Sequence, residues 1–219
     1  MDDNYFIRIK DLRFDYGNGK EVFRNLNFSL QKNERIGLIG SNGAGKTTLF
    51  YMIMGLLKPL SGRIEVFGKA RKSEDDFSEV RRRIGLLFQD SDDQLFCPTV
   101  EEDIAFGPLN LGKSHDEARA IVREACDKLG LRGYEKRITH RLSAGEKRLV
   151  ALATVMAMQP DCYLLDEPTS GLDEITTGRF LTYLQEHADT YVIISHDHNF
   201  LKETVDTIYQ LREGTLTVR

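Results

Sequence analysis

A glycine-rich octapeptide constrains the fold of this 219-residue chain more than any other feature. Residues 40–47 read GSNGAGKT and match the pattern GxxxxGKS/T. They follow the apolar run IGLI at residues 36–39, which is typical of a buried parallel strand. Glycines let successive backbone N–H groups turn inward, and the N-terminus of a following helix adds partial positive charge. The octapeptide therefore predicts a strand, a phosphate-binding loop and a helix in succession.

Apolar residues after the loop recur at the spacing i, i+3, i+4 and i+7, which predicts a helix. They are Leu49, Met52, Ile53 and Leu56. We expect Pro59 and Gly62 to end it. Within the loop, Lys46 is suited to pair with the β- and γ-phosphates of a nucleotide. Thr47 is suited to place its hydroxyl on Mg²⁺.

The rest of the chain predicts an α/β fold with one inserted helical segment. Alternating apolar residues in 6–14 and 26–30 predict an antiparallel β piece, and further strands are expected at 84–88, 162–165, 191–195 and 207–211. Residues 89–159 contain three capping boxes: Thr99 with Glu102, Ser114 with Glu117, and Ser143 with Glu146. We expect a RecA-like P-loop NTPase core formed by 1–88 and 160–219, with the antiparallel piece at its N-terminus and 89–159 as a helical subdomain.

Composition excludes several other classes. The net charge of −4, with acids and bases interspersed, disfavours a nucleic-acid partner. Cys97, Cys126 and Cys162 are odd in number and have no CxxC spacing, which disfavours disulfides or a zinc site. No stretch approaches the roughly 18 to 20 apolar residues of a membrane span, and the first residues lack a signal-peptide pattern.

A second pattern places two acids at the end of a strand, where an enzyme that hydrolyses nucleoside triphosphates needs them. Residues 162–167 read CYLLDE, an apolar strand that ends in two carboxylates. Strands of a parallel sheet open at one edge, so the pair should emerge near the phosphate loop. Asp166 suits the Mg²⁺ shell, and Glu167 suits the polarisation of an attacking water.

Residues 142–146 read LSAGE and resemble the LSGGQ signature of the ABC ATPases. Gln89 resembles the Q-loop glutamine of that family, residues 170–173 (SGLD) its D-loop, His196 its switch histidine and Tyr16 its adenine-stacking aromatic. The resemblance covers nearly the whole chain and implies ATP hydrolysis with Mg²⁺. It assigns Mg²⁺ or water contact to Gln89 and a γ-phosphate bond to His196, and it makes the helical segment a signature subdomain.

The resemblance also implies a dimer, with itself or a paralogue, that closes on ATP. Ser143 and Gly145 of one chain would meet the γ-phosphate held by the other, and Asp173 would help link the chains. The signature departs from the family pattern at Ala144 and Glu146. The nucleotide contacts expected elsewhere are Tyr16, Ser41, Asn42, Gly43, Ala44, Gly45, Lys46, Thr47 and Thr48.

Residues 88–112 resemble the same stretch in ATPases of energy-coupling-factor importers, above all those for cobalt and nickel. The chain ends soon after a hairpin expected around Gly214, which also favours that branch. The resemblance implies transmembrane partners that contact the region after Gln89, and a peripheral position on the cytoplasmic face of the membrane. A vitamin importer, an ABC ATPase without a transport role, and a P-loop kinase or GTPase remain alternatives.

Two metal-like patterns are rejected. Residues 90–101 mimic a calcium loop, but Leu95 stands where the turn requires glycine. His196 and His198 lack a third ligand nearby in sequence.

Overall fold

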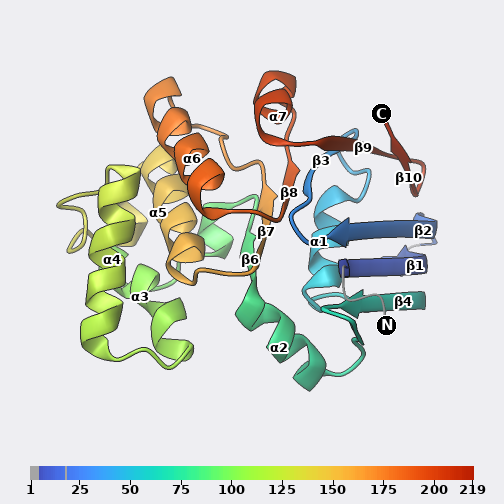
Figure 1. Cartoon of the computed structure of the whole chain (residues 1–219), viewed down its shortest axis with the longest axis horizontal. Helices are drawn as coiled ribbons and strands as arrows, with labels where there is room; N and C mark the ends of the chain where they lie inside the picture. Colours follow the sequence, from blue (N-terminus) through green and yellow to red (C-terminus); the bar gives the residue numbers. More distant parts are fainter. Residues whose placement is uncertain (1–4, 18) are drawn as a thin grey trace. The chain divides into compact units, whose positions relative to one another are not determined.

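The computed structural model describes residues 5–17 and 19–219. Contacts within the chain separate two compact units. The first unit runs to Ile84 and resumes at Asp189, and the second comprises Gly85–Ala188. Each unit combines strands and helices, as Figure 1 shows by colour along the sequence.

The first unit contains an antiparallel sheet in the order β2-β1-β4-β5. Its strands are β1 (Tyr5–Asp15), β2 (Glu21–Gln31), β4 (Ser61–Val66) and β5 (Lys69–Ala70). Ile7 pairs with Leu30 and Ile9 with Phe28, all buried, which confirms the antiparallel piece predicted from alternation. Strand β4 was not predicted, because the sequence there begins with Ser61 and Gly62, which are typical of a turn.

Four other strands of the first unit lie in the order β10-β9-β3-β8. Strand β3 (Arg35–Ile39) is parallel to both β8 (Tyr191–Ile194) and β9 (Thr207–Arg212). Strand β10 (Thr215–Val218) is antiparallel to β9 and forms the predicted final hairpin. Helices α1 (Lys46–Ile53), α2 (Glu74–Arg83) and α7 (His198–Thr204) complete this unit.

Helix α1 ends earlier than predicted. It stops at Ile53, and Gly55 follows with a φ of 72°. A side chain at Gly55 could not be accommodated, because its Cβ would lie 2.2 Å from the ring of Phe77. Leu56, which the apolar pattern placed on the helix, lies beyond this turn and is 48% exposed. The helical periodicity therefore extended past the point where tertiary packing turns the chain.

The second unit contains two neighbouring strands and most of the helices. The strands are β6 (Ile84–Leu87) and β7 (Cys162–Asp166), and the helices are α3 (Val100–Asn110), α4 (His115–Leu129), α5 (Ala144–Ala157) and α6 (Glu174–His187). Short 3₁₀ turns lie at Ser91–Asp93 and Thr139–Arg141. The predicted capping boxes form at the starts of α3, α4 and α5. A further box at α2, Ser73 with Asp76, was not predicted.

The second unit is wider than the helical subdomain predicted at 89–159, since it includes β7 and α6. Contact density and the functional division of a chain are different properties. The predicted division into a core and a helical subdomain at 89–159 therefore stays a prediction. Within residues 5–17 and 19–219, no helix is long and apolar enough to span a bilayer.

Candidate nucleotide-binding and hydrolysis residues

The glycine loop of the first unit has the backbone that phosphate binding requires. Gly43 and Gly45 have φ values of 75° and 105°. Any side chain at Gly45 would collide with the neighbouring strand, since its Cβ would lie 2.6 Å from Val22 Cγ1. Gly40 approaches β9 as closely, because its Cβ would lie 2.6 Å from the carbonyl oxygen of Leu211. Glycine is therefore needed at 40 and 45 for space, and at 43 and 45 for conformation.

The loop leads directly into α1, whose N-terminus carries partial positive charge. Gly45 is the N-cap residue, and among the described residues no side chain caps this end and no acid lies in the first turn. The side chain of Lys46 is buried and folds back over the loop. Its Nζ donates to the carbonyl oxygens of Gly40 at 2.8 Å and Ser41 at 3.1 Å. An ammonium beside a glycine-rich loop at a helix N-terminus favours the binding of an anion.

Tyr16 lies against this loop. It follows β1, its ring is 57% exposed, and it packs edge-on against Phe14 at 4.9 Å between ring centroids. Its hydroxyl is hydrogen-bonded to Thr48 Oγ1 at 2.8 Å. The exposed aromatic is thus connected to the helix that follows the phosphate loop.

His196 follows β8 and is exposed. Because β8 is parallel to β3, the loops after both strands open at the same edge of the sheet. The predicted switch histidine and the glycine loop therefore leave the first unit at one edge.

In the second unit, the predicted carboxylates lie at the end of β7. Asp166 is 2% exposed and Glu167 is half-buried. Glu167 adopts a φ of 49°, which is uncommon for a residue with a side chain and costs on the order of 1–3 kcal/mol. Such strain persists only where surrounding contacts impose it, and it is concentrated at functional sites.

Gln89 lies just beyond β6 and its side chain is exposed. The backbones of Gln89 and Glu167 both accept hydrogen bonds from Arg148, a buried residue of α5. The structure therefore brings Gln89, Asp166 and Glu167 together in the second unit. In the first unit it places Tyr16 beside α1, and His196 at the sheet edge from which the glycine loop leaves.

The signature residues form the start of α5. The Ser143 hydroxyl accepts the N–H of Glu146 at 3.3 Å, and the Glu146 carboxylate accepts the N–H of Ser143 at 2.8 Å. Arg137 pairs with the same carboxylate at 3.1 Å. Hydrogen bonds from Ser143 and Tyr134 hold the pKa of Glu146 below its usual value. The unusual acid of the signature thus has a structural role in capping its own helix.

Sequence reasoning missed Arg148, although one signal could have revealed it. Arg148 falls at position i of an apolar series whose other members are Ala151, Leu152 and Val155, all buried. A cation on the apolar face of a helix requires buried acceptors, and the ends of two neighbouring strands provide them.

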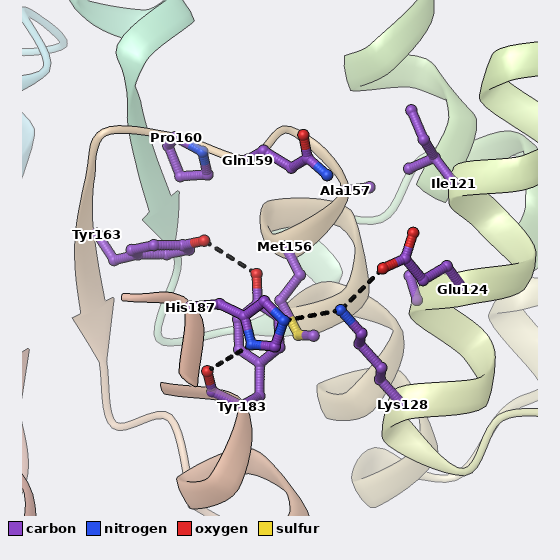
Figure 2. A pocket seen from close by; sticks show the side chains of 11 residues that line it. Ile121, Glu124, Lys128, Met156, Ala157, Gln159, Pro160, Tyr163, Tyr183 and His187 are labelled. Atoms are coloured by element: carbon purple, nitrogen blue, oxygen red, sulfur yellow. Dashed lines mark hydrogen bonds and ion pairs between the residues drawn. The ribbon is translucent and has the colours of Figure 1, made fainter. Parts of the chain in front are cut away.

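A cavity of about 260 Å³ also lies in the second unit, and Figure 2 shows the side chains that line it. Its polar groups bond to one another: Tyr163 to Tyr183 at 3.0 Å, and Lys128 to His187 at 3.0 Å and to Glu124 at 2.8 Å. None of the predicted site residues lines it. This network explains how α4 and α6 are held in contact.

Comparisons with known proteins agree with these features. Residues 23–170 match the family described as ABC transporter. A putative ABC transporter ATP-binding protein of Nitratidesulfovibrio vulgaris is 47% identical over 96% of this chain and 78% of its own length. The energy-coupling factor transporter ATP-binding protein EcfA of Methanothermobacter thermautotrophicus is 42% identical over 96% of this chain and 69% of its own.

Among solved structures, cbiO1 from Clostridium perfringens, described as part of the ABC transporter complex cbiONQ, has a TM-score of 0.83 at 34% identity. The match covers 98% of this chain and 87% of that one. The phosphate loop and the acids at the end of β7 are typical of a class of nucleotide-hydrolysing proteins, the P-loop NTPases. Within that class, the chain belongs to the ABC transporter family and is an ATP-binding, ATP-hydrolysing subunit.

Proposed function

We propose that this chain powers an energy-coupling-factor importer for cobalt or nickel ions. The observation that carries the proposal is the stretch 88–112, which resembles the ATPases of such systems and forms a prominent apolar surface in the second unit. The similarity to cbiO1 and to EcfA supports the same class of transporter. A vitamin importer of that class is the second candidate, favoured by the EcfA relatives alone.

The proposed hydrolysis divides its tasks among the predicted residues. Lys46 and the glycine loop hold the phosphates, Tyr16 stacks on the adenine, and His196 bonds the γ-phosphate. Glu167 orients the attacking water, and Gln89 contacts the water or the metal. The hydroxyl of Thr47 and the buried carboxylate of Asp166 are hard oxygen donors, which fit Mg²⁺. The ion, when bound, neutralises charge on the phosphates.

The role of Glu167 is tested by Glu167→Gln. Loss of the carboxylate should lower turnover by about 10²- to 10⁴-fold, the usual contribution of a general base, while ATP binding is retained. In this variant ATP should also trap a dimer, which analytical ultracentrifugation with and without ATP would detect. Undiminished turnover would remove Glu167 from its proposed role.

The surface after Gln89 is the proposed contact for transmembrane subunits. Phe96 and Phe106 are 66% and 48% exposed and pack edge-on at 4.8 Å between ring centroids. Buried Asp103 fixes the loop beside them, since it accepts the N–H groups of Phe96 at 3.0 Å and Cys97 at 2.9 Å. Cys97 and Phe106 both line a groove of about 700 Å³. Exposed apolar surface of this kind marks interaction sites.

Co-purification tests this contact. The chain is expressed with the transmembrane subunits from its own membrane, and detergent-solubilised complexes are recovered through a tag on those subunits. Phe106→Asp should abolish recovery of the chain while leaving its ATP binding unchanged. Val218→Asp is the matched control, because Val218 is also an exposed apolar residue and lies in the first unit. Equal recovery of both variants would exclude the Phe96–Phe106 surface.

The cargo is tested by uptake. Cells that lack their own importers and express the complete complex should accumulate radioactive Co²⁺ or Ni²⁺, and accumulation should stop with Glu167→Gln. Uptake of a labelled vitamin without metal uptake would favour the second candidate. A chain that binds no membrane subunit at all would favour an ABC ATPase without a transport role.

A further inference from the structure

A single arginine connects two segments that the proposed mechanism uses separately. Arg148 lies on α5 and is 3% exposed. Its Nη1 donates to the carbonyl oxygens of Phe88 at 2.6 Å and Gln89 at 3.3 Å. Its Nη2 donates to the carbonyl oxygens of Glu167 at 2.5 Å and of Asp166. One planar guanidinium thus bridges the residues that follow β6 and the residues that end β7.

Arg148 remains charged in this buried position. Burial lowers the pKa of its guanidinium to about 10, and the nearby negative charges of Asp166, Glu167 and Asp90 oppose that shift. An arginine guanidinium stays protonated in proteins, so the group donates charge-assisted hydrogen bonds, which are stronger than neutral ones. A planar fork with several donors can serve two acceptors on each side, whereas a lysine is a single point charge.

The contact with Glu167 stabilises an unfavourable backbone. Glu167 has a φ of 49°, and its carbonyl oxygen accepts from Arg148 at 2.5 Å. The direction of the Glu167 side chain follows from the backbone conformation that this bond helps to impose. The hydrogen bond from Arg148 fixes the backbone of Glu167, and it therefore also fixes the position of the Glu167 carboxylate.

The segment after β6 is attached to α5 at further points. The Gln94 side chain accepts from the N–H of Phe88 at 3.1 Å and donates to Thr154 at 2.7 Å. Lys147 donates to Asp92 at 2.5 Å. Arg148 is the member of this set that also contacts the end of β7. Helix α5 begins at the signature, so Arg148 links the helix of the signature to both Gln89 and Glu167.

We propose that Arg148 is a positioning residue for ATP hydrolysis, which holds the backbones of Gln89 and Glu167 in one fixed arrangement. This inference rests on the proposed roles of Gln89 and Glu167. It predicts that Arg148 acts on the rate of the hydrolytic step, through those two residues, and leaves the affinity for nucleotide nearly unchanged.

Three variants distinguish positioning from packing. Arg148→Met keeps the length of the side chain and removes all donors. Arg148→Lys keeps the charge and loses the fork. Arg132→Met is the control, because Arg132 lies in the same unit with its side chain 85% exposed and paired with Asp127 at the surface. Each is made in the full chain, and its folding is checked by circular dichroism and thermal unfolding.

The readouts are kcat, KM and the Kd for a fluorescent ATP analogue. We expect Arg148→Met to lower kcat by about tenfold or more, the loss expected when charge-assisted bonds are removed, and to change KM and Kd by less than about threefold. Arg148→Lys should give an intermediate kcat. Arg132→Met should match the wild type.

A double-mutant cycle with Gln89→Ala provides the test that packing alone would not pass. If Arg148 acts through Gln89 and Glu167, then the fold loss in kcat from Arg148→Met should be smaller in the Gln89→Ala background than in wild type, because only the part that acts through Glu167 remains. The same fold loss in both backgrounds would overturn the proposal, as would a kcat within twofold of wild type in folded Arg148→Met. Should the methionine variant not fold, Arg148→Lys is decisive, and full activity there would also overturn it.

The outcome is separable from the proposed function. Glu167→Gln in the same assay reports whether Glu167 is the catalytic carboxylate, independently of Arg148. An active Glu167→Gln enzyme would contradict the proposed role of Glu167. An inactive one, combined with a fully active Arg148→Lys and additive cycles, would contradict only the positioning role of Arg148.

Discussion

Two helix N-termini in this chain are predicted to face phosphate, and they are built in opposite ways. Helix α1 of the first unit starts at Gly45, and within the part of the chain that the structure describes it has no side-chain cap and no acid in its first turn. Helix α5 of the second unit starts at Ser143, whose hydroxyl and N–H both bond to Glu146. The first end starts from a glycine loop, and the second is capped by its own side chains.

The difference separates a site that can bind phosphate by itself from one that must exchange partners to do so. Helix α1 starts with Lys46, a cation. The first turn of α5 carries Glu146, an anion that Arg137 partly neutralises. Free N–H groups and positive charge attract a phosphate, whereas a carboxylate at the same place repels it. Nucleotide affinity should therefore depend on the first unit, and the second should act mainly on turnover.

The largest expected effect comes from replacing the glycine at the start of each helix, Gly45 or Gly145, with alanine. Gly45→Ala should lower nucleotide affinity by about 30-fold or more, since a left-handed φ of 105° and a Cβ 2.6 Å from Val22 both oppose it. Gly145 has ordinary helical backbone, and a Cβ added there would lie 3.1 Å from the carbonyl oxygen of Gly171. The affinity of Gly145→Ala should stay within about threefold of wild type while turnover falls. Calorimetric titration with ATP measures both affinities.

Equal losses of affinity in the two variants would show that the units do not divide binding and turnover. Circular dichroism and thermal unfolding serve as the control for Gly45→Ala, because a loop that no longer folds would also lose its ligand. Gly43→Ala provides a milder comparison, with a φ of 75° and nothing within 4 Å of the added Cβ.

The next effect in size concerns the cation at α1. Lys46→Met keeps the apolar stem of the buried side chain and removes the ammonium, so nucleotide affinity should fall by about tenfold to 100-fold. The binding of a fluorescent ATP analogue gives the constant. Lys147→Met, in the second unit, is the control and should leave affinity unchanged, since its ammonium bonds to Asp92. Unchanged affinity in Lys46→Met would mean that the glycine loop alone holds the phosphates.

Glu146→Gln should have a smaller and opposite effect. The amide preserves the size of the cap and removes the negative charge from the start of α5. The ATP concentration that half-saturates hydrolysis should fall about twofold to fivefold, in line with the magnitude of charges near a helix end. Steady-state ATPase assays at constant ionic strength measure it. A rise in that concentration would indicate that the carboxylate supports the signature as a cap more than it repels phosphate.

The smallest effect is on stability and depends on pH. The pKa of Glu146 is lowered in the folded chain by hydrogen bonds from Ser143 and Tyr134. A lowered pKa means that the ionised cap stabilises the fold above the unfolded pKa of about 4.3, and that this contribution disappears as the pH falls through the folded value. The melting temperature of wild type should exceed that of Glu146→Gln by about 2 °C or less at pH 7, with the gap closing below about pH 4. Thermal unfolding at a series of pH values tests this.

Much of the fold followed from the sequence because its signals are local. The glycine loop, the alternation at Ile7 and Ile9 and the capping boxes at Thr99, Ser114 and Ser143 each involve residues a few positions apart. Composition and spacing within such short windows determine the local backbone. The family assignment also followed, because its motifs occur in order along the chain.

The remainder depends on contacts between residues far apart in sequence. Arg148 reaches Phe88 and Glu167, and no window of the sequence contains all three. The early end of α1 depends on Phe77, and the role of Glu146 depends on Arg137. Periodicity specifies which face of an element is apolar, and it does not specify which side chains meet across elements. For the roles of Gln89, His196 and Glu167, the predictions remain predictions.

The hydrogen bond between Tyr16 and Thr48 bears on how the chain would distinguish one nucleotide from another. The Tyr16 hydroxyl is hydrogen-bonded at 2.8 Å to Thr48 of the phosphate-binding helix, and the tyrosine, which is 57% exposed, can offer a base the face of its ring. Stacking of that kind contributes about 1–3 kcal/mol per base and accepts purines with little discrimination. Preference for adenine over guanine would then have to come from other parts of the assembly, and the occupied phosphate loop would keep the aromatic ring oriented for whichever base arrives.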